Sequence, residues 1–235
     1  GTALAICMIM VIVILYVVNT ASFKPEVNRG RTCYITTVMS NGKDDNRRIS
    51  YSSLGLPLVK ECCYPLKGAE AVTAINMDRY RPLTASSMDG LKNRTSYISY
   101  TDTAFWKIFQ FDFQQGGPFS PAAFTSGISE SVALALFGTD QVVGREMKLD
   151  FIVYNICGVV KDVSRFASKA WAEVWIPYTV RDDGGYQEGI NGSYSCCVLL
   201  RPGVTREELR TEALRKVEEF NAKTRDVKAD ILHQP

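Results

Sequence analysis

The chain begins with an apolar run that limits how the rest of it can fold. Residues 3–18 all belong to hydrophobic types, and no charged residue occurs before Lys24. A helix over this run is about 24 Å long, somewhat less than the roughly 30 Å of a hydrocarbon core. We expect a transmembrane helix at residues 1–22 that lacks part of its start, because neither Met nor a basic segment precedes Gly1. The residues expected to anchor this helix are Leu4, Ile12, Leu15 and Val18.

Two other interpretations of the apolar run stay open. It could be a signal peptide, although the missing basic start and the poor small-residue cleavage pattern near Ala21 disfavour that. It could also be a helix buried in a protein core. With the membrane interpretation, the rest of the chain folds outside the cytoplasm.

Composition predicts a folded domain and excludes several kinds of site. Of the 235 residues, 46% are hydrophobic and 22% are charged, which is typical of globular proteins. The net charge of +2 gives no reason to expect a nucleic-acid partner. His233 is the one histidine, so a histidine-rich zinc site or a Ser-His-Asp triad lacks material. P-loop, G-x-G-x-x-G and G-x-S-x-G motifs are absent, so we expect no cofactor, metal or catalytic residue in this chain.

The seven cysteines include two adjacent pairs and no C-x-x-C motif. Neighbouring residues of a strand point to opposite faces, so at most one member of each pair faces a given core. A disulfide between Cys62 or Cys63 and Cys196 or Cys197 is possible in an oxidising compartment, and the sequence leaves it open.

Hydrophobic periodicity predicts an α+β architecture with two lobes. A helix is expected over residues 49–63, and strands over 31–39, 69–77 and 94–101. Near the end, a strand at 194–201 precedes an amphipathic helix with a capping box from Thr205 to Glu208. We therefore expect a βαβ-type lobe made of residues 31–100 and 194–235. It would be split by an inserted mixed α/β lobe at residues 101–193.

The inserted segment opens with a dense group of aromatic residues between 104 and 113. Phe105, Trp106 and Phe109 are candidates for a surface that contacts a ligand or a partner. Core packing is the alternative, because aromatic side chains bury large apolar areas.

Several short motifs between residues 100 and 178 occur in a specific order. They are YTDTAFWKIF at 100–109, GPF at 117–119, SESVALALFG at 129–138, VGREM at 143–147, ICGVVKD at 156–162 and WIPY at 175–178. This series resembles the MacB-like periplasmic core domain of ABC transporter permeases of the FtsX/MacB type. The segment from Leu149 to Phe151 departs from the family, in which a glycine-containing turn is common.

The resemblance implies a function for the whole chain. It implies an extracytoplasmic domain of a bacterial permease of the export or mechanotransmission type, in the inner membrane and facing the periplasm, without catalysis of its own. ATP would bind a separate ATPase subunit or domain. A second permease copy and a periplasmic protein are further partners that the resemblance suggests.

Two other classes of function are alternatives. A membrane-anchored ligand sensor, such as the outer domain of a receptor, would have the same anchor and a similar α+β domain. A secreted enzyme would need acidic residues such as Asp182 and Asp183, which lie in a turn-like polar segment.

Overall fold

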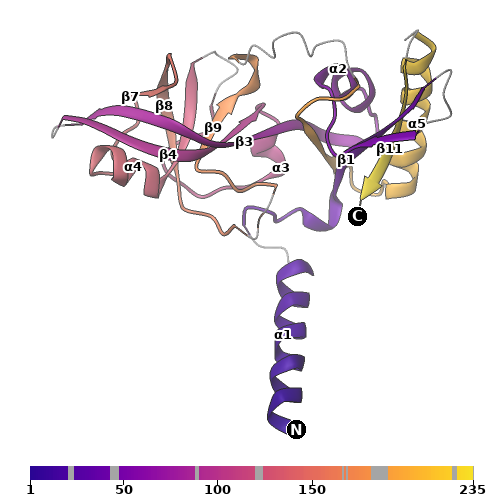
Figure 1. Ribbon diagram of the computed structural model, residues 1–235, viewed down its shortest axis with the longest axis horizontal. Coiled ribbons are helices and arrows are strands. Elements are labelled where there is room, and N and C mark those ends of the chain that lie inside the picture. The colour runs from indigo at the N-terminus through magenta and orange to yellow at the C-terminus, as the bar shows by residue number, and fades with distance from the viewer. Residues whose placement is uncertain are drawn as a thin grey trace.

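An apolar helix, α1 (Thr2–Thr20), extends away from the folded domain (Figure 1). The computed structural model describes residues 1–20, 24–42, 48–87, 90–119, 124–165, 167, 169–180, 190–223 and 227–234. Leu4, Ile12 and Leu15 are 70%, 62% and 54% exposed, so α1 packs little against the chain. The side chain of Val18 lies outside the described part. Among the described residues, no helix combines the length and hydropathy that mark a membrane span.

One 11-stranded sheet runs through the domain. Its main path has the order β11-β1-β10-β3-β4-β9-β6-β8-β5, while β2 pairs with β1, and β7 pairs with β3 and β8. The β4–β9 and β6–β8 pairs are parallel, and the others are antiparallel. The strands are β1 (Thr32–Gly42), β2 (Arg48–Tyr51), β3 (Ala69–Ser87), β4 (Gly90–Thr101), β5 (Phe113–Gly116), β6 (Thr125–Ser129), β7 (Glu146–Leu149), β8 (Ile152–Val160), β9 (Val174–Pro177), β10 (Ser195–Leu200) and β11 (Val227–Gln234).

Short helices surround this sheet. Two longer ones, α4 and α5, lie at opposite ends of the domain (Figure 1). The helices are η1 (Arg29–Arg31), α2 (Leu56–Leu58), the π-helix η2 (Val59–Cys63), α3 (Phe105–Ile108), α4 (Glu130–Phe137), η3 (Tyr178–Val180) and α5 (Arg206–Lys223).

Three hydrophobic clusters form the core. The first-lobe core joins β1, β10 and the start of β3 to η2 and α5, and includes Cys33, Leu58, Val72 and Val217. The second-lobe core joins the end of β3 and β4 to β6–β9 and α4, and includes Leu83, Ile98 and Leu136. The aromatic cluster lies around α3, with Phe105, Trp106, Phe109 and Trp175.

The hydrophobic clusters show how the strands contribute to the two lobes, but they do not define where the lobes begin and end in the sequence. Apolar packing divides β3, since Ala69, Val72 and Ala74 pack in the first lobe and Leu83 in the second. The strand β3 is therefore shared. The domain boundaries at residues 100 and 194 stay a prediction.

Short sequence patterns predicted some helix ends correctly and others incorrectly. The capping box forms as expected, since Thr205 N donates to Glu208 Oε2 at 2.8 Å and Glu208 N donates to Thr205 Oγ1 at 3.2 Å. Gly138 ends α4 in the left-handed region with φ 71°. The helix expected over 49–63 forms only from Leu56 to Cys63, as α2 and η2, because residues 48–51 pair with β1 as strand β2.

Candidate functional site: the junction between α1 and the two lobes

Residues 24–31 follow α1, and we call them the connector. Backbone hydrogen bonds and ion pairs order this segment and hold it against the domain. Gln110 N donates to Pro25 O at 2.9 Å, and Lys24 pairs with Asp112. Arg29 Nη2 lies 2.6 Å from Glu26 Oε2, and Glu26 is only 5% exposed. A buried carboxylate needs such a partner, because an unpaired buried charge is strongly unfavourable. The connector is therefore ordered by its own Arg29–Glu26 pair and lies against the domain through Pro25 and Lys24.

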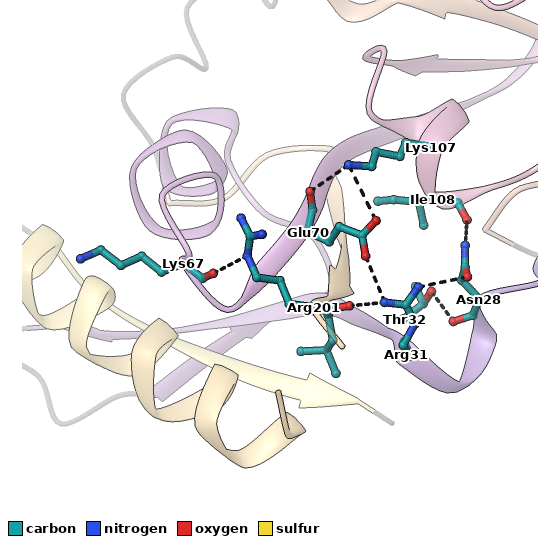
Figure 2. A network of polar contacts seen from close by, with 9 residues as sticks. Asn28, Arg31, Thr32, Lys67, Glu70, Lys107, Ile108 and Arg201 are labelled. Atoms are coloured by element: carbon teal, nitrogen blue, oxygen red, sulfur yellow. Dashed lines mark hydrogen bonds and ion pairs between the residues drawn. The ribbon is translucent and has the colours of Figure 1, made fainter. Parts of the chain in front are cut away.

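Arg31 is the centre of a polar network that we call the connector network (Figure 2). Its Nη1 donates to Glu70 Oε2 of β3 at 3.0 Å and to Leu200 O of β10 at 2.8 Å. Its Nη2 donates to Asn28 Oδ1 at 3.4 Å. The planar guanidinium has several donors in fixed directions, so one side chain can hold three segments together.

The same network reaches α3 through Asn28 and Lys107. Asn28 Nδ2 donates to Ile108 O at 3.3 Å, and Lys107 Nζ lies 3.8 Å from Glu70 Oε1 (Figure 2). The hydrogen bond from Arg31, with the nearby positive charge of Lys107, lowers the pKa of the Glu70 carboxyl below its usual value. Glu70 therefore stays ionised and links the connector to α3, which carries the aromatic cluster.

A second polar centre joins the lobes, and we call it the Asp102 joint. Asp102 follows β4, and its Oδ1 accepts hydrogen bonds from Ala104 N at 2.9 Å and Phe105 N at 3.2 Å. These bonds satisfy backbone donors at the start of α3. Its Oδ2 accepts a hydrogen bond from Tyr64 Oη and one from Ala74 N at 3.4 Å. The Tyr64 and Tyr178 hydroxyls lie 3.4 Å apart, and Tyr178 packs against both lobe cores.

Burial dominates the electrostatics of the Asp102 joint. It raises the pKa of Asp102 above its usual value, although the hydrogen bond from Tyr64 counteracts part of this effect. Burial and the Asp102 charge raise the pKa of Tyr64 far above its usual value. The tyrosine therefore remains a hydrogen-bond donor to the carboxylate over the whole physiological range.

The aromatic residues that the sequence singled out are core residues. Phe105, Trp106 and Phe109 are 0%, 9% and 1% exposed. Their rings pack in edge-to-face and tilted arrangements, and the Trp106 ring centre lies 5.8 Å from that of Trp175. We expected these side chains on a contact surface, and their burial shows that this expectation was wrong. They pack in the core, which was the alternative.

Sequence reasoning missed the residues that make the junction. The partners in each contact are far apart in sequence, 39 positions for Arg31 and Glu70 and 38 for Tyr64 and Asp102. Only Asp102 gave a signal, since an acidic residue just before a helix is typical of a cap. Asp182 and Asp183 lie outside the described residues. In the part of the chain that is described, no group of three His, Cys, Asp or Glu residues could hold a metal ion.

Solved structures of transporter domains have the same fold. A domain of a putative permease from Porphyromonas gingivalis is 22% identical, with a TM-score of 0.68 over 88% of this chain and 90% of that one. The periplasmic region of MacB from Actinobacillus actinomycetemcomitans is 14% identical, with a TM-score of 0.56 over 84% and 88%. The extracellular domain of the noncanonic ABC-type transporter YknZ from Gram-positive bacteria is 14% identical, with a TM-score of 0.53 over 83% and 99%.

The sequence comparison identifies the family. No curated protein matches the chain in sequence. The sequence profile of the MacB-like periplasmic core domain, however, matches residues 2–216, which covers far more than the motif series at 100–178. The resemblance found from the motifs is thereby confirmed. The chain belongs to the MacB-like periplasmic core domain family, a domain of ABC transporter permeases.

Proposed function

We propose that this domain transmits movement between the membrane and the periplasm in an ABC transporter of the export type. It would do so as a mechanical part, without covalent chemistry of its own. The observation that carries the proposal is the connector network. Arg31 joins the segment after α1 to β3 and β10, and Asn28 joins it to α3. A pull on the connector would therefore reach the core directly, since packed elements transmit displacement.

We place α1 in the membrane and the domain on the periplasmic face of the inner membrane. The apolar side chains of α1 are largely exposed, because little of the rest of the chain packs against them. Keeping them in water is unfavourable, at roughly 25 cal/mol for each Å² of apolar surface. The family match supports this orientation, because the family is a periplasmic one.

The transporter needs partners that supply energy and complete the path. ATP would bind an ABC ATPase subunit or a separate cytoplasmic domain, and a second permease copy and a periplasmic protein would complete the assembly. Movement driven by ATP would then enter the domain through α1 and its connector.

The test measures movement of the domain in the assembled transporter, in lipid vesicles, with labels at positions 4 and 151. Leu4 lies in α1, and Phe151 is 94% exposed on the second lobe. The distance between the labels is compared with ADP and with ATP plus vanadate. We expect a nucleotide-dependent change in the wild type. The Arg31→Gln, Glu70→Gln double variant should lose most of this change while it still hydrolyses ATP.

A matched control separates coupling from loss of charge. Arg210→Gln removes another exposed arginine, whose pair with Glu207 at 3.5 Å lies within α5 and is not one of the contacts of the connector network. This variant should move like the wild type. A wild type without nucleotide-dependent movement, or a double variant that moves as the control does, would contradict the proposed function.

A further inference from the structure

Two cysteines from distant segments meet inside the first-lobe core. In β10, successive side chains alternate between faces: Cys196 and Val198 pack in the first-lobe core, while Cys197 packs in the aromatic cluster. Cys196 is 0% exposed, and its neighbours across the sheet are Ile35 of β1 and Ala74 of β3. The Cys196 thiol therefore points to the face that η2 and α5 cover.

The π-helix η2 presents Cys63 to this face. Its neighbour Cys62 points elsewhere, since the Cys62 thiol donates to Lys216 O of α5 at 3.6 Å. Cys63 is 0% exposed and packs in the same first-lobe core as Cys196. The interaction with the Cys63 thiol and burial raise the pKa of the Cys196 thiol well above its usual range. The two thiols are thus neighbours in a dry core.

The remaining described cysteines lack such a partner thiol. Cys33 shares the face of Cys196 but sits opposite Val198, one step further along the sheet. Cys197 is on the other face, and the Cys157 thiol donates to Ser126 O at 3.1 Å. The placement therefore selects one pairing from the several that the two adjacent pairs would allow.

We propose that Cys63 and Cys196 form a disulfide in the exported protein. This inference rests on the proposed location of the domain outside the cytoplasm, where disulfides persist. The oxidant is a dithiol–disulfide donor, either a protein disulfide or glutathione disulfide. One thiolate attacks the donor disulfide, and the second then attacks the mixed disulfide. Two thiols lose two protons and two electrons, and the donor is released as two thiols.

The timing of the reaction follows from burial. A thiol with a raised pKa and no access to solvent reacts slowly, because the thiolate is the nucleophile. The bond would therefore form during folding, before η2 closes over β10. Once formed, it would link chain segments on either side of the second lobe, so η2 could not separate from the sheet. Reduction should lower the melting temperature by about 5–15 °C, as removal of a stabilising cross-link does in a domain of this size.

The test refolds the full chain, reduced, in detergent micelles with glutathione disulfide. Free thiols are then alkylated in denaturant, and unreduced peptides are mapped by mass spectrometry. We expect a linked pair of peptides carrying residues 62–63 and 196–197. Four serine variants assign the bond: Cys63→Ser and Cys196→Ser should abolish the link, while the matched Cys62→Ser and Cys197→Ser should retain it. The wild-type map does not depend on the folding of any variant.

A parallel map of chain taken from a bacterial envelope separates this inference from the proposed function. Full alkylation of Cys63 and Cys196 after refolding would overturn the pairing, wherever the domain resides. A link that persists in Cys63→Ser and is lost in Cys62→Ser would overturn it as well. A bond that forms on refolding but is missing from the envelope-derived chain would support the pairing and contradict the extracytoplasmic location.

Discussion

The Asp102 joint and the connector network both hold distant segments together, but their surroundings differ. Asp102 is half-buried, and its carboxylate accepts hydrogen bonds from Tyr64 and from three backbone amides. In the connector network, Arg31 and Glu70 are 40% and 29% exposed, so water competes for each contact. Buried hydrogen bonds are costly to break, whereas exposed ion pairs contribute little to stability. The lobes are therefore joined firmly, and the connector is held by contacts that can exchange.

Asp102→Ala should have the largest effect on stability. It leaves the Tyr64 hydroxyl and the Ala104 amide without the carboxylate acceptor, while Phe105 N keeps its hydrogen bond to the backbone oxygen of residue 102 at 3.3 Å. We expect a loss of about 3 kcal/mol in the free energy of unfolding, or about 6–12 °C in melting temperature. Thermal unfolding of the full chain in micelles measures it. Asp112→Ala removes an exposed carboxylate paired with Lys24, and an equal loss there would show that burial is not the cause.

Tyr64→Phe should have a smaller effect, because it removes one donor and keeps the packing. We expect about 1–2 kcal/mol, typical of a hydrogen bond to a charged group. Tyr178→Phe is the matched variant, since the one described hydrogen-bond partner of its hydroxyl is the Tyr64 hydroxyl at 3.4 Å. If denaturant unfolding ranked the two variants in the reverse order, the hydrogen bond to Asp102 would not be the main contact of the joint.

Breaking the Arg31–Glu70 pair should cost less still. A double-mutant cycle with Arg31→Gln and Glu70→Gln should give a coupling energy of about 0.2–1 kcal/mol. The coupling should decrease as salt is raised from 0.05 to roughly 0.5 M, because exposed charges are screened. A coupling that is large and independent of salt would remove the contrast between the two regions.

The two carboxylates should also give pH dependences of opposite sign, and this is the smallest expected effect. The pKa of Asp102 is raised by folding, so its ionisation opposes folding as pH rises through that pKa. The pKa of Glu70 is lowered, so its contribution to stability is present at neutral pH and is lost as pH falls through that pKa. Unfolding measured from pH 7 to about pH 4 should show the wild type gaining stability relative to Asp102→Asn and losing it relative to Glu70→Gln.

Sequence reasoning succeeded where the determining contacts are local. The capping box at Thr205 and the glycine end at Gly138 involve residues within a few positions, and both formed as expected. The strand expected at 69–77 instead runs to Ser87. Polar residues near Arg81 obscure this continuation in the sequence pattern. In the structure the strand continues because β4 pairs with it on one side and β7 on the other.

The junction could not be found in this way. Arg31 is hydrogen-bonded to Leu200 although 169 positions separate them in the sequence. No local pattern near either residue predicts this contact. The aromatic residues around α3 show a different limit of the sequence. Periodicity placed Phe105 and Phe109 on one face of a helix, but it could not tell whether that face is buried or exposed. The match to residues 2–216 supplied the family, while the packing of α3 decided burial.

The shared strand β3 contains a bend that would act as a lever in the proposed movement. Its pairing with β4 shifts register between Asp78 and Arg81, and Tyr80 there has a φ of 31°. Such a bulge bends a strand locally. From Arg81 to Ser87 the strand beyond it is about 20 Å long, so a rotation of roughly 10° of the second lobe about the bulge would carry its outer end ~3.5 Å. A displacement too small to disturb the connector contacts would then be magnified at the far hairpin.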